Sequence, residues 1–164
     1  MTSILVFQTI NLSNMLLAKD GIFPITKDRY GQLLPEYPAS GFAFPGTIQG
    51  EGKLCGIPSL FIRLAGCNLH CRWQMADGSF SPCDTTYAAY EVKDARQMNV
   101  DAIYDTVVQN SETISHIVIT GGEPMLQATE LETLCNRLKH DNRYHLTIET
   151  NATIFNENVA HYID

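Results

Sequence analysis

The sequence predicts an α/β fold in which parallel strands alternate with helices. Short apolar runs rich in β-branched residues, such as 116–120, alternate with segments that carry apolar residues at helical spacing, such as 127–140. The apolar runs end in loops of glycine and polar residues, where parallel α/β folds place their ligand-binding loops. We therefore expect one functional site at the carboxyl edge of a parallel sheet.

Six elements follow from this alternation, and the helix at 127–140 is the best marked. Its apolar residues recur at the spacing of one helical face, namely Leu131, Leu134, Cys135 and Leu138. The alternating order favours parallel βαβ units. In chain order we expect a strand at 59–65, a helix within 94–111, a strand at 116–120, a helix at 127–140, a strand at 144–149 and a short helix near 156–160.

One domain preceded by an N-terminal arm is the expected organisation. A chain of 164 residues is long enough for a single domain with a continuous core. Residues 1–41 predict the arm, because much of this segment is rich in glycine, proline and polar residues. Residues 42–164 predict the domain itself.

Composition and charge argue against several functions. The formal net charge of −7 opposes a broad nucleic-acid-binding face, which needs clustered Lys and Arg. No run approaches the ~18 apolar residues of a membrane span, and the first apolar stretch lacks the basic start of a secretion signal. Five cysteines in such a chain indicate a cytoplasmic protein with reduced thiols.

Three of the five cysteines, Cys67, Cys71 and Cys83, fall within 17 residues directly after the strand at 59–65. Three thiolates suit a 4Fe–4S cluster that keeps one iron open for a small ligand. A zinc site with His70 as the fourth ligand also fits the spacing. Because the Cys-x3-Cys-x11-Cys spacing is unusual for either metal, spacing alone leaves both interpretations open.

The loop Gly121-Gly122-Glu123-Pro124 comes directly after the strand at 116–120. Its glycines would let a ligand approach the backbone closely, and Glu123 could pair with an ammonium group. The alternative is a turn that starts a helix, with Pro124 in its first turn and the carboxylate of Glu123 at its N-terminus.

Two further groups of polar residues flank the cysteines. Gln49, Glu51 and Arg63 lie at or before the strand at 59–65, and the fork of an arginine suits carboxylate recognition. The alternative for Arg63 is a solvated edge position or an ion pair with Glu51. Asp84-Thr85 directly follows Cys83 and could bind Mg²⁺ through oxygen, although Asp and Thr also favour helix N-caps.

The combination of these motifs resembles the radical S-adenosylmethionine (SAM) superfamily and, within it, the 7-carboxy-7-deazaguanine synthase family of queuosine biosynthesis. The resemblance covers about residues 42–151, and no single motif is as specific as the order of all of them. The segments that carry it are Thr47–Gly52, Phe61–Cys71, Cys83–Thr85, Ile119–Gln127 and Ile148–Asn151.

The resemblance implies a partial (βα) barrel of the radical SAM type, with Cys67, Cys71 and Cys83 as ligands of a 4Fe–4S cluster. It implies that Gly121, Gly122, Glu123, Pro124, Trp73 and Glu149 bind SAM. By matching position, the substrate would contact Gln49, Gly50, Glu51, Arg63 and Gly121. Thr85 would help to hold Mg²⁺.

The implied activity is that of a lyase that converts 6-carboxy-5,6,7,8-tetrahydropterin to 7-carboxy-7-deazaguanine with loss of ammonia. An electron entering the cluster would cleave SAM, and the resulting 5′-deoxyadenosyl radical would abstract hydrogen from the pterin. The expected partners are an electron donor such as flavodoxin or ferredoxin and a second copy in a homodimer. Direct binding of nucleic acid or of a membrane is not expected.

The sequence departs from the family pattern in three places. Gln74 stands where the third cysteine is usual, and an insertion, Met75–Pro82, precedes Cys83. Cys83 is the expected third ligand because Asp-Thr follows it directly. Asn151-Ala152 stands where Asn-Gly is common, and the chain ends at Asp164 where the family continues. We therefore expect either a C-terminally truncated barrel or a barrel that is completed in another way.

Two other functions stay open at this point. One is an activase-type radical SAM protein that acts on a glycyl residue of another protein. The other is a zinc-binding module or an inactive fragment. The Gln49, Glu51 and Arg63 set favours the lyase over the activase, because it suits a small carboxylated heterocycle.

Overall fold

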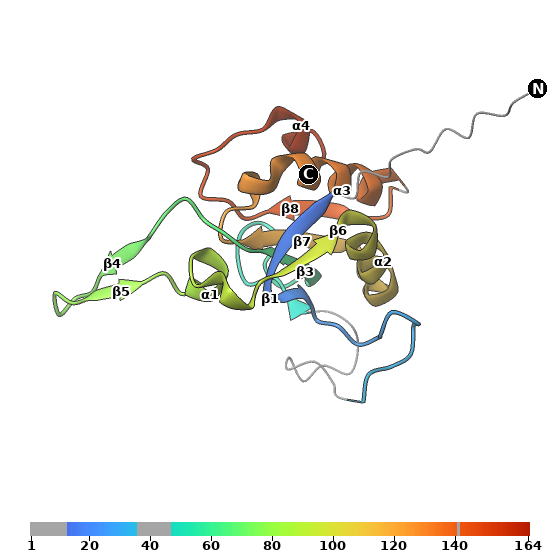
Figure 1. Cartoon of the computed structure of the whole chain (residues 1–164), viewed down its shortest axis with the longest axis horizontal. Helices are drawn as coiled ribbons and strands as arrows, with labels where there is room; N and C mark the ends of the chain where they lie inside the picture. Colours follow the sequence, from blue (N-terminus) through green and yellow to red (C-terminus); the bar gives the residue numbers. More distant parts are fainter. Residues whose placement is uncertain (1–12, 36–46, 141) are drawn as a thin grey trace, which may run out of the picture.

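The computed structural model describes residues 13–35, 47–140 and 142–164. They form a six-stranded sheet in the order β6-β1-β3-β7-β8, with β2 paired to β3 (Figure 1). The strands are β1 (Asn14–Phe23), β2 (Thr47–Ile48), β3 (Pro58–Leu64), β6 (Arg96–Asn99), β7 (His116–Gly121) and β8 (His145–Ile148). β3, β7 and β8 are parallel, as the sequence predicts, whereas β1 runs antiparallel to β3 and β6.

The helices differ in length and in distance from the sheet. α2 (Val100–Ser111) and α3 (Ala128–His140) are the long ones, and α1 (Thr86–Ala89) and α4 (Glu157–Ala160) are single turns. Two 3₁₀ segments, η1 (Val92–Asp94) and η2 (Pro124–Gln127), complete them. Among the described residues, every helix is too short or too polar to cross a bilayer.

The core lies between the sheet and the two long helices. Alternate residues of β3 and β7, such as Leu60, Ile62 and Ile119, are buried together with apolar residues of α2 and α3. The predicted face of α3 is confirmed, since Leu131, Leu134, Cys135 and Leu138 are all fully buried. The opposite face of β3, β7 and β8 therefore carries the remaining side chains, and many of these are polar.

The prediction for 94–111 was correct for the helix but too long at its start. Residues Arg96–Asn99 form β6, whose residues pair with Asn14–Leu17 of β1, and the helix begins only at Val100. The amide of Ala102 donates to the side chain of Asn99, which caps the helix N-terminus. The short run before the helix was not recognisable as a strand, because its partner lies about 80 residues earlier in the chain.

Strand β1 lies within the sheet, between β3 and β6. It therefore belongs to the same sheet as the strand that precedes the cysteines, although it falls inside the predicted N-terminal arm. Residues 1–12 and the predicted domain boundary after residue 41 lie outside the described residues, so the division into arm and domain stays a prediction.

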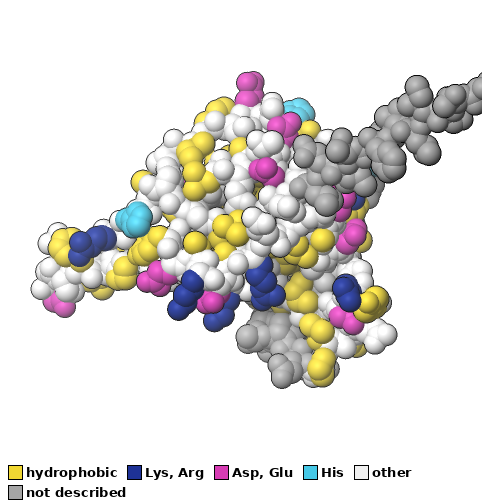
Figure 2. All heavy atoms as spheres, in the orientation of Figure 1, with side chains coloured by type: hydrophobic (Ala, Val, Ile, Leu, Met, Phe, Trp, Pro, Cys, Tyr) yellow, Lys and Arg dark blue, Asp and Glu magenta, His cyan; other side chains and the backbone are white. Residues whose placement is uncertain are grey.

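The segment between Cys71 and Cys83 is a β-hairpin that projects from the body beside α1 (Figure 1). Its strands are β4 (Arg72–Gln74) and β5 (Phe80–Pro82), and the Asp77 carboxylate closes the turn between them by accepting from Ser79. Hydrophobic side chains lie on its surface in Figure 2. The exposed ones are Trp73, Met75 and Phe80.

Candidate active site

The loops that follow β3 and β7 are joined by backbone hydrogen bonds. The amide of Gly122 donates to the carbonyl of Leu64 at 3.1 Å, and the amide of Glu123 donates to the carbonyl of Gly66 at 2.8 Å. The amide of Gly66 in turn donates to the carbonyl of Ala88 in α1 at 2.8 Å. The cysteine loop, the Gly-Gly-Glu-Pro loop and α1 thus meet at one edge, as predicted from the strand ends.

The two glycines of the Gly121–Pro124 loop allow this close approach. A Cβ on Gly121 would lie 2.0 Å from the carbonyl oxygen of Leu64, and a Cβ on Gly122 would lie 2.2 Å from that of Gly66. Gly121 also has a φ of 139°, which L side chains rarely adopt. The structure therefore gives these glycines a packing role between neighbouring strands, which the sequence interpretation did not include.

Glu123 is fully buried, and both of its carboxylate oxygens are hydrogen-bonded. They accept from the amide of Met125 at 2.9 Å, the hydroxyl of Thr150 at 2.8 Å and the amide of Asn151 at 2.8 Å. The carboxylate thus caps η2, with Pro124 in the first turn, as the helix-start alternative predicts. It also ties the loop after β7 to the loop after β8, and its contact with a SAM ammonium group stays a prediction.

Gln49 and Glu149 form a polar pair on the side of the sheet that α2 and α3 leave uncovered. The side-chain amide of Gln49 donates to Oε1 of Glu149 at 2.9 Å, and the hydroxyl of Thr120 donates to Oε2 at 2.6 Å. The amide of Glu51 donates to the side-chain oxygen of Gln49 at 3.1 Å. Gln49, Glu51 and Glu149 also line a common pocket. Two predicted substrate contacts and one predicted SAM contact are therefore brought together.

Arg63 lies on the same face of the sheet, beside Thr120 of β7. It forms an ion pair through Nε with Oδ2 of Asp20 at 3.1 Å, and the predicted alternative of an ion pair with Glu51 is wrong. Its guanidinium lies against the rings of Phe23 and Tyr87, 5.3 Å and 6.0 Å from the ring centroids. Asp20 was missed because the pairing of β1 with β3 brings it there from 43 residues away.

His116 is a buried residue for which the sequence interpretation proposes no role. Its ring bridges the hydroxyl of Ser59 on β3, 2.7 Å away, and the hydroxyl of Thr147 on β8, 2.9 Å away. Burial, assisted by the nearby His145, lowers the pKa of His116 below its usual value, so the neutral ring is favoured. Its position at the start of an apolar strand was the available signal, because a polar residue there needs a partner on the next strand.

The three candidate ligand cysteines are partly buried, unbridged thiols. Cys71 and Cys83 flank the base of the hairpin, where Arg72 pairs with Pro82, so the insertion between them does not separate them. Among the described residues, no group of three His, Cys, Asp or Glu side chains is arranged as a metal site. The His70 ring stacks on Tyr90, with centroids 4.5 Å apart.

A family model described as "Radical SAM superfamily" matches residues 61–164. The chain belongs to the radical SAM superfamily. Two curated relatives of this radical SAM protein are 7-carboxy-7-deazaguanine synthases. The one from Rickettsia prowazekii is 42% identical over 115 residues, which cover 66% of this chain and 42% of the relative. The one from Halobacterium salinarum is 43% identical over 108 residues, which cover 66% and 37%.

A solved structure is also similar to this radical SAM protein. The crystal structure of QueE from Escherichia coli superposes with a TM-score of 0.52 and 28% sequence identity, over 67% of this chain and 53% of QueE. This likeness confirms the predicted fold class, an α/β structure of the radical SAM type with parallel strands. The chain spans less than half the length of the two curated relatives above.

Radical SAM proteins use a 4Fe–4S cluster and SAM, and the cysteine loop of this one carries suitable donors. Two N–H groups point at the sulfur of Cys67, the amide of Leu69 at 3.4 Å and the side-chain amide of Asn151 at 3.7 Å. A cysteine binds iron through its sulfur, and N–H groups that contact the ligand sulfur help to orient it. Asn151, which also donates to Asn68 at 3.0 Å, is a site residue that the sequence interpretation did not include.

Two predicted contacts of this radical SAM protein remain predictions. Trp73 lies on the projecting hairpin and is 63% exposed. Thr85 occupies the N-cap position of α1 without capping it, since its side chain makes no hydrogen bond to the helix backbone. Its hydroxyl lies 3.5 Å from both the carboxylate of Asp84 and the sulfur of Cys83. The Mg²⁺ assignment thus rests on a hydroxyl and a carboxylate that are adjacent and accessible.

Proposed function

We propose that this protein is a radical SAM lyase that converts 6-carboxy-5,6,7,8-tetrahydropterin to 7-carboxy-7-deazaguanine with loss of ammonia. The observation that carries the proposal is the set of polar side chains on the uncovered face of the sheet, next to the cysteine loop. Arg63, Gln49 and Glu149 together present a cation, an amide and a carboxylate. A carboxylated, hydrogen-bonding heterocycle requires that combination. The names of the curated relatives support the same activity.

The residues divide into two groups in this proposal. Cys67, Cys71 and Cys83 hold the cluster, and the Gly121–Pro124 loop with Glu149 lies beside SAM. When bound, the cluster and SAM supply the one-electron chemistry that starts hydrogen abstraction. The protein's own part is to bind the pterin, to orient its reacting carbon and to exclude water.

On the substrate side, the two terminal guanidinium nitrogens of Arg63 bind the pterin carboxylate. Glu51 lines the pocket together with Gln49, and Gly50 connects these two residues in the chain. Gln49 is itself hydrogen-bonded to Glu149, so pterin binding requires Gln49 either to share Glu149 with the substrate or to turn its amide toward it. Glu149 is therefore common to the substrate side and the SAM side of the site.

The proposal includes finer assignments. Thr85, together with Asp84, holds Mg²⁺ near the substrate carboxylate. A flavodoxin or a ferredoxin supplies the electron, the active form is a homodimer, and the protein works in the cytoplasm in the pathway to queuosine. Neither nucleic acid nor a membrane takes part directly.

The test is turnover by anaerobically reconstituted protein with a chemical reductant, SAM and 6-carboxytetrahydropterin. We expect a 4Fe–4S cluster that depends on the three cysteines, seen as brown colour with iron and sulfide in equal amount. We also expect release of 5′-deoxyadenosine and 7-carboxy-7-deazaguanine. Colourless protein that binds one zinc would overturn the assignment in favour of the zinc-binding module. Cleavage of SAM without any effect of the pterin would favour the activase.

A further inference from the structure

Strand β1 is interrupted by a large bulge directly opposite Arg63. Leu17 pairs with Leu64 and Ile22 with Ile62, so the four residues Ala18–Gly21 face the single residue Arg63. A β-bulge normally adds one residue, bends the strand and redirects a side chain, and bulges are frequent next to active sites. The bulge in β1 has three extra residues, and one of its side chains contacts Arg63.

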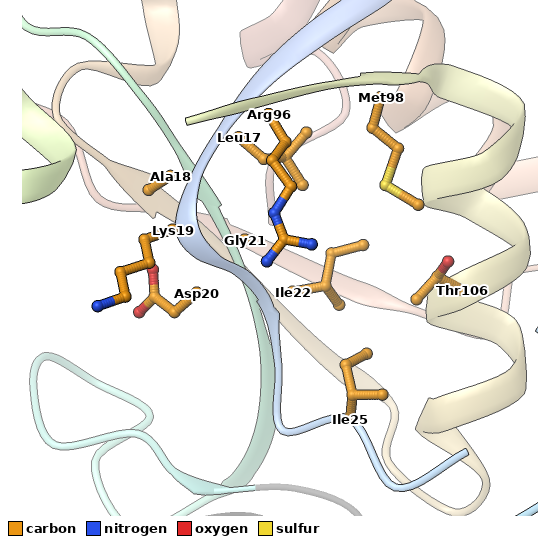
Figure 3. A pocket seen from close by; sticks show the side chains of 10 residues that line it. All are labelled: Leu17, Ala18, Lys19, Asp20, Gly21, Ile22, Ile25, Arg96, Met98 and Thr106. Carbon is orange, nitrogen blue, oxygen red and sulfur yellow. The ribbon is translucent and has the colours of Figure 1, made fainter. Parts of the chain in front are cut away.

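The geometry of the bulge depends on Gly21. Its φ is +44°, and a Cβ there would lie 3.3 Å from the side chain of Leu17. Figure 3 shows the result: Asp20 and Lys19 lie on one side of β1, and Arg96 and Ile22 lie across the strand around a hollow. Asp20 is one of the residues that line this hollow, and its carboxylate also contacts Arg63 of β3.

Asp20 uses one oxygen to hold two groups. Its Oδ2 accepts from Nε of Arg63 at 3.1 Å and from the hydroxyl of Tyr87 at 2.9 Å. The Tyr87 hydroxyl donates in this contact, because an ionised carboxylate oxygen can only accept. β3, β1 and α1 each contribute one member of this group, and α1 directly follows Cys83-Asp84-Thr85.

The contact with Asp20 leaves the terminal part of Arg63 available. Within residues 13–35, 47–140 and 142–164, only Nε of this side chain is hydrogen-bonded, and the ring of Phe23 lies against the guanidinium. An arginine held through Nε and by stacking has a fixed plane, and its two terminal nitrogens then point in one direction as a fork. Orienting the fork in advance reduces the entropy that carboxylate binding costs.

We propose that Asp20 is a positioning residue for Arg63, which it orients to receive the carboxylate of the substrate. This inference rests on the proposed function, in which Arg63 binds the carboxylate of the pterin. Asp20 does not touch the substrate and acts only through Arg63. Tyr87 fixes the carboxylate of Asp20 and thereby links the arginine to the helix that follows Cys83.

The test compares the binding of two ligands to the anaerobically reconstituted chain of 164 residues. The ligands are 6-carboxytetrahydropterin and tetrahydropterin without the carboxyl group. In the wild type the carboxylated ligand should bind more tightly. Asp20→Asn and Asp20→Ala should weaken the binding of the carboxylated ligand on the order of tenfold, because one well-oriented charge-assisted contact is lost. The affinity for the ligand without the carboxyl group should stay unchanged. Lys19→Ala, a bulge residue that faces solvent, serves as the matched control and should change neither.

Three further measurements separate positioning from folding. The thermal midpoint identifies any variant that is only unfolded, and Tyr87→Phe perturbs Asp20 without altering the bulge. In the background of Arg63→Ala, Asp20→Asn should have no further effect on the carboxylated ligand. In the wild type, the Nε–H of Arg63 should give an NMR signal that exchanges slowly, and Asp20→Asn should speed its exchange.

Two outcomes are distinguishable as failures. If the wild type does not prefer the carboxylated pterin, the proposed substrate is wrong, and the role of Asp20 is overturned with it. If the wild type shows the preference and folded Asp20→Asn and Asp20→Ala variants keep it in full, the role of Asp20 alone is overturned. An additive effect of Asp20→Asn and Arg63→Ala would do the same.

Discussion

Arg72 of β4 pairs with Pro82 of β5 at the base of the hairpin, and two cysteines lie directly outside this pair. Cys71 and Cys83 are twelve positions apart in the sequence, yet each directly adjoins a member of the same residue pair. The hairpin therefore brings together the backbone on either side of the insertion, although eleven residues separate the two cysteines in the chain.

Cys83→Ala should abolish cluster binding, because two thiolates do not hold the cluster that three would hold. The measurement is iron and acid-labile sulfide per chain after anaerobic reconstitution. Cys55→Ala is the matched control, because Cys55 is exposed and lies outside the cysteine loop, and it should retain the wild-type amount. Wild-type iron content in Cys83→Ala would exclude Cys83 as a ligand.

Gly122→Ala should destabilise the protein by about 2–3 kcal/mol, because its Cβ would lie 2.2 Å from the carbonyl oxygen of Gly66 and the backbones would have to separate. Urea unfolding of the two proteins gives the difference in the free energy of unfolding. The control is Gly50→Ala, where a Cβ meets nothing within 4 Å, and its stability should stay within about 1 kcal/mol of the wild type. Equal stability of both variants would contradict the packing role.

Stability should fall as the pH drops below about 6.5, partly because of His116. The pKa of His116 is lowered in the folded state, first by burial and then by His145. Between the lowered pKa and that of the unfolded chain, the unfolded state binds more protons, so stability increases with pH in that window and the contribution is complete above it. Urea midpoints between pH 5 and 7.5 measure this dependence.

His116→Gln removes the titrating group and should flatten the pH dependence of stability. His161→Gln is the control, because His161 is exposed, and it should leave the slope as it is in the wild type. A slope in His116→Gln equal to that of the wild type would show that other groups dominate. Because a glutamine can still bridge Ser59 and Thr147, part of the neutral-pH stability should remain.

The parts of the fold that could be predicted from the sequence are those with local signals. The apolar run at 116–120 and the face of α3 are periodic within a few residues, and both were located correctly. β1 was not recognised as one strand, because its bulge breaks the alternation between Leu17 and Ile22. β6 was missed because its partner is distant in the chain.

The candidate site shows the same division. The carboxyl-edge rule correctly brought together the cysteine loop, the Gly121–Pro124 loop and Glu149, because strand order alone determines that edge. Asp20, Asn151 and His116 were not predicted, since each acquires its role from a partner on another element. A single sequence does not identify the partner in such pairs, whereas the structure gives their distances directly.

Gly66 connects three loops through its main-chain atoms alone, with its amide on Ala88 and its carbonyl on Glu123. Contacts of this kind do not depend on the identity of the surrounding side chains. Leu69, whose contact with Cys67 is likewise made by its main-chain amide, can therefore be exchanged without altering the spacing of the loops. At this edge the main-chain hydrogen bonds keep the loops in place, while side chains around them can change. This arrangement allows a site to acquire new specificity by few mutations.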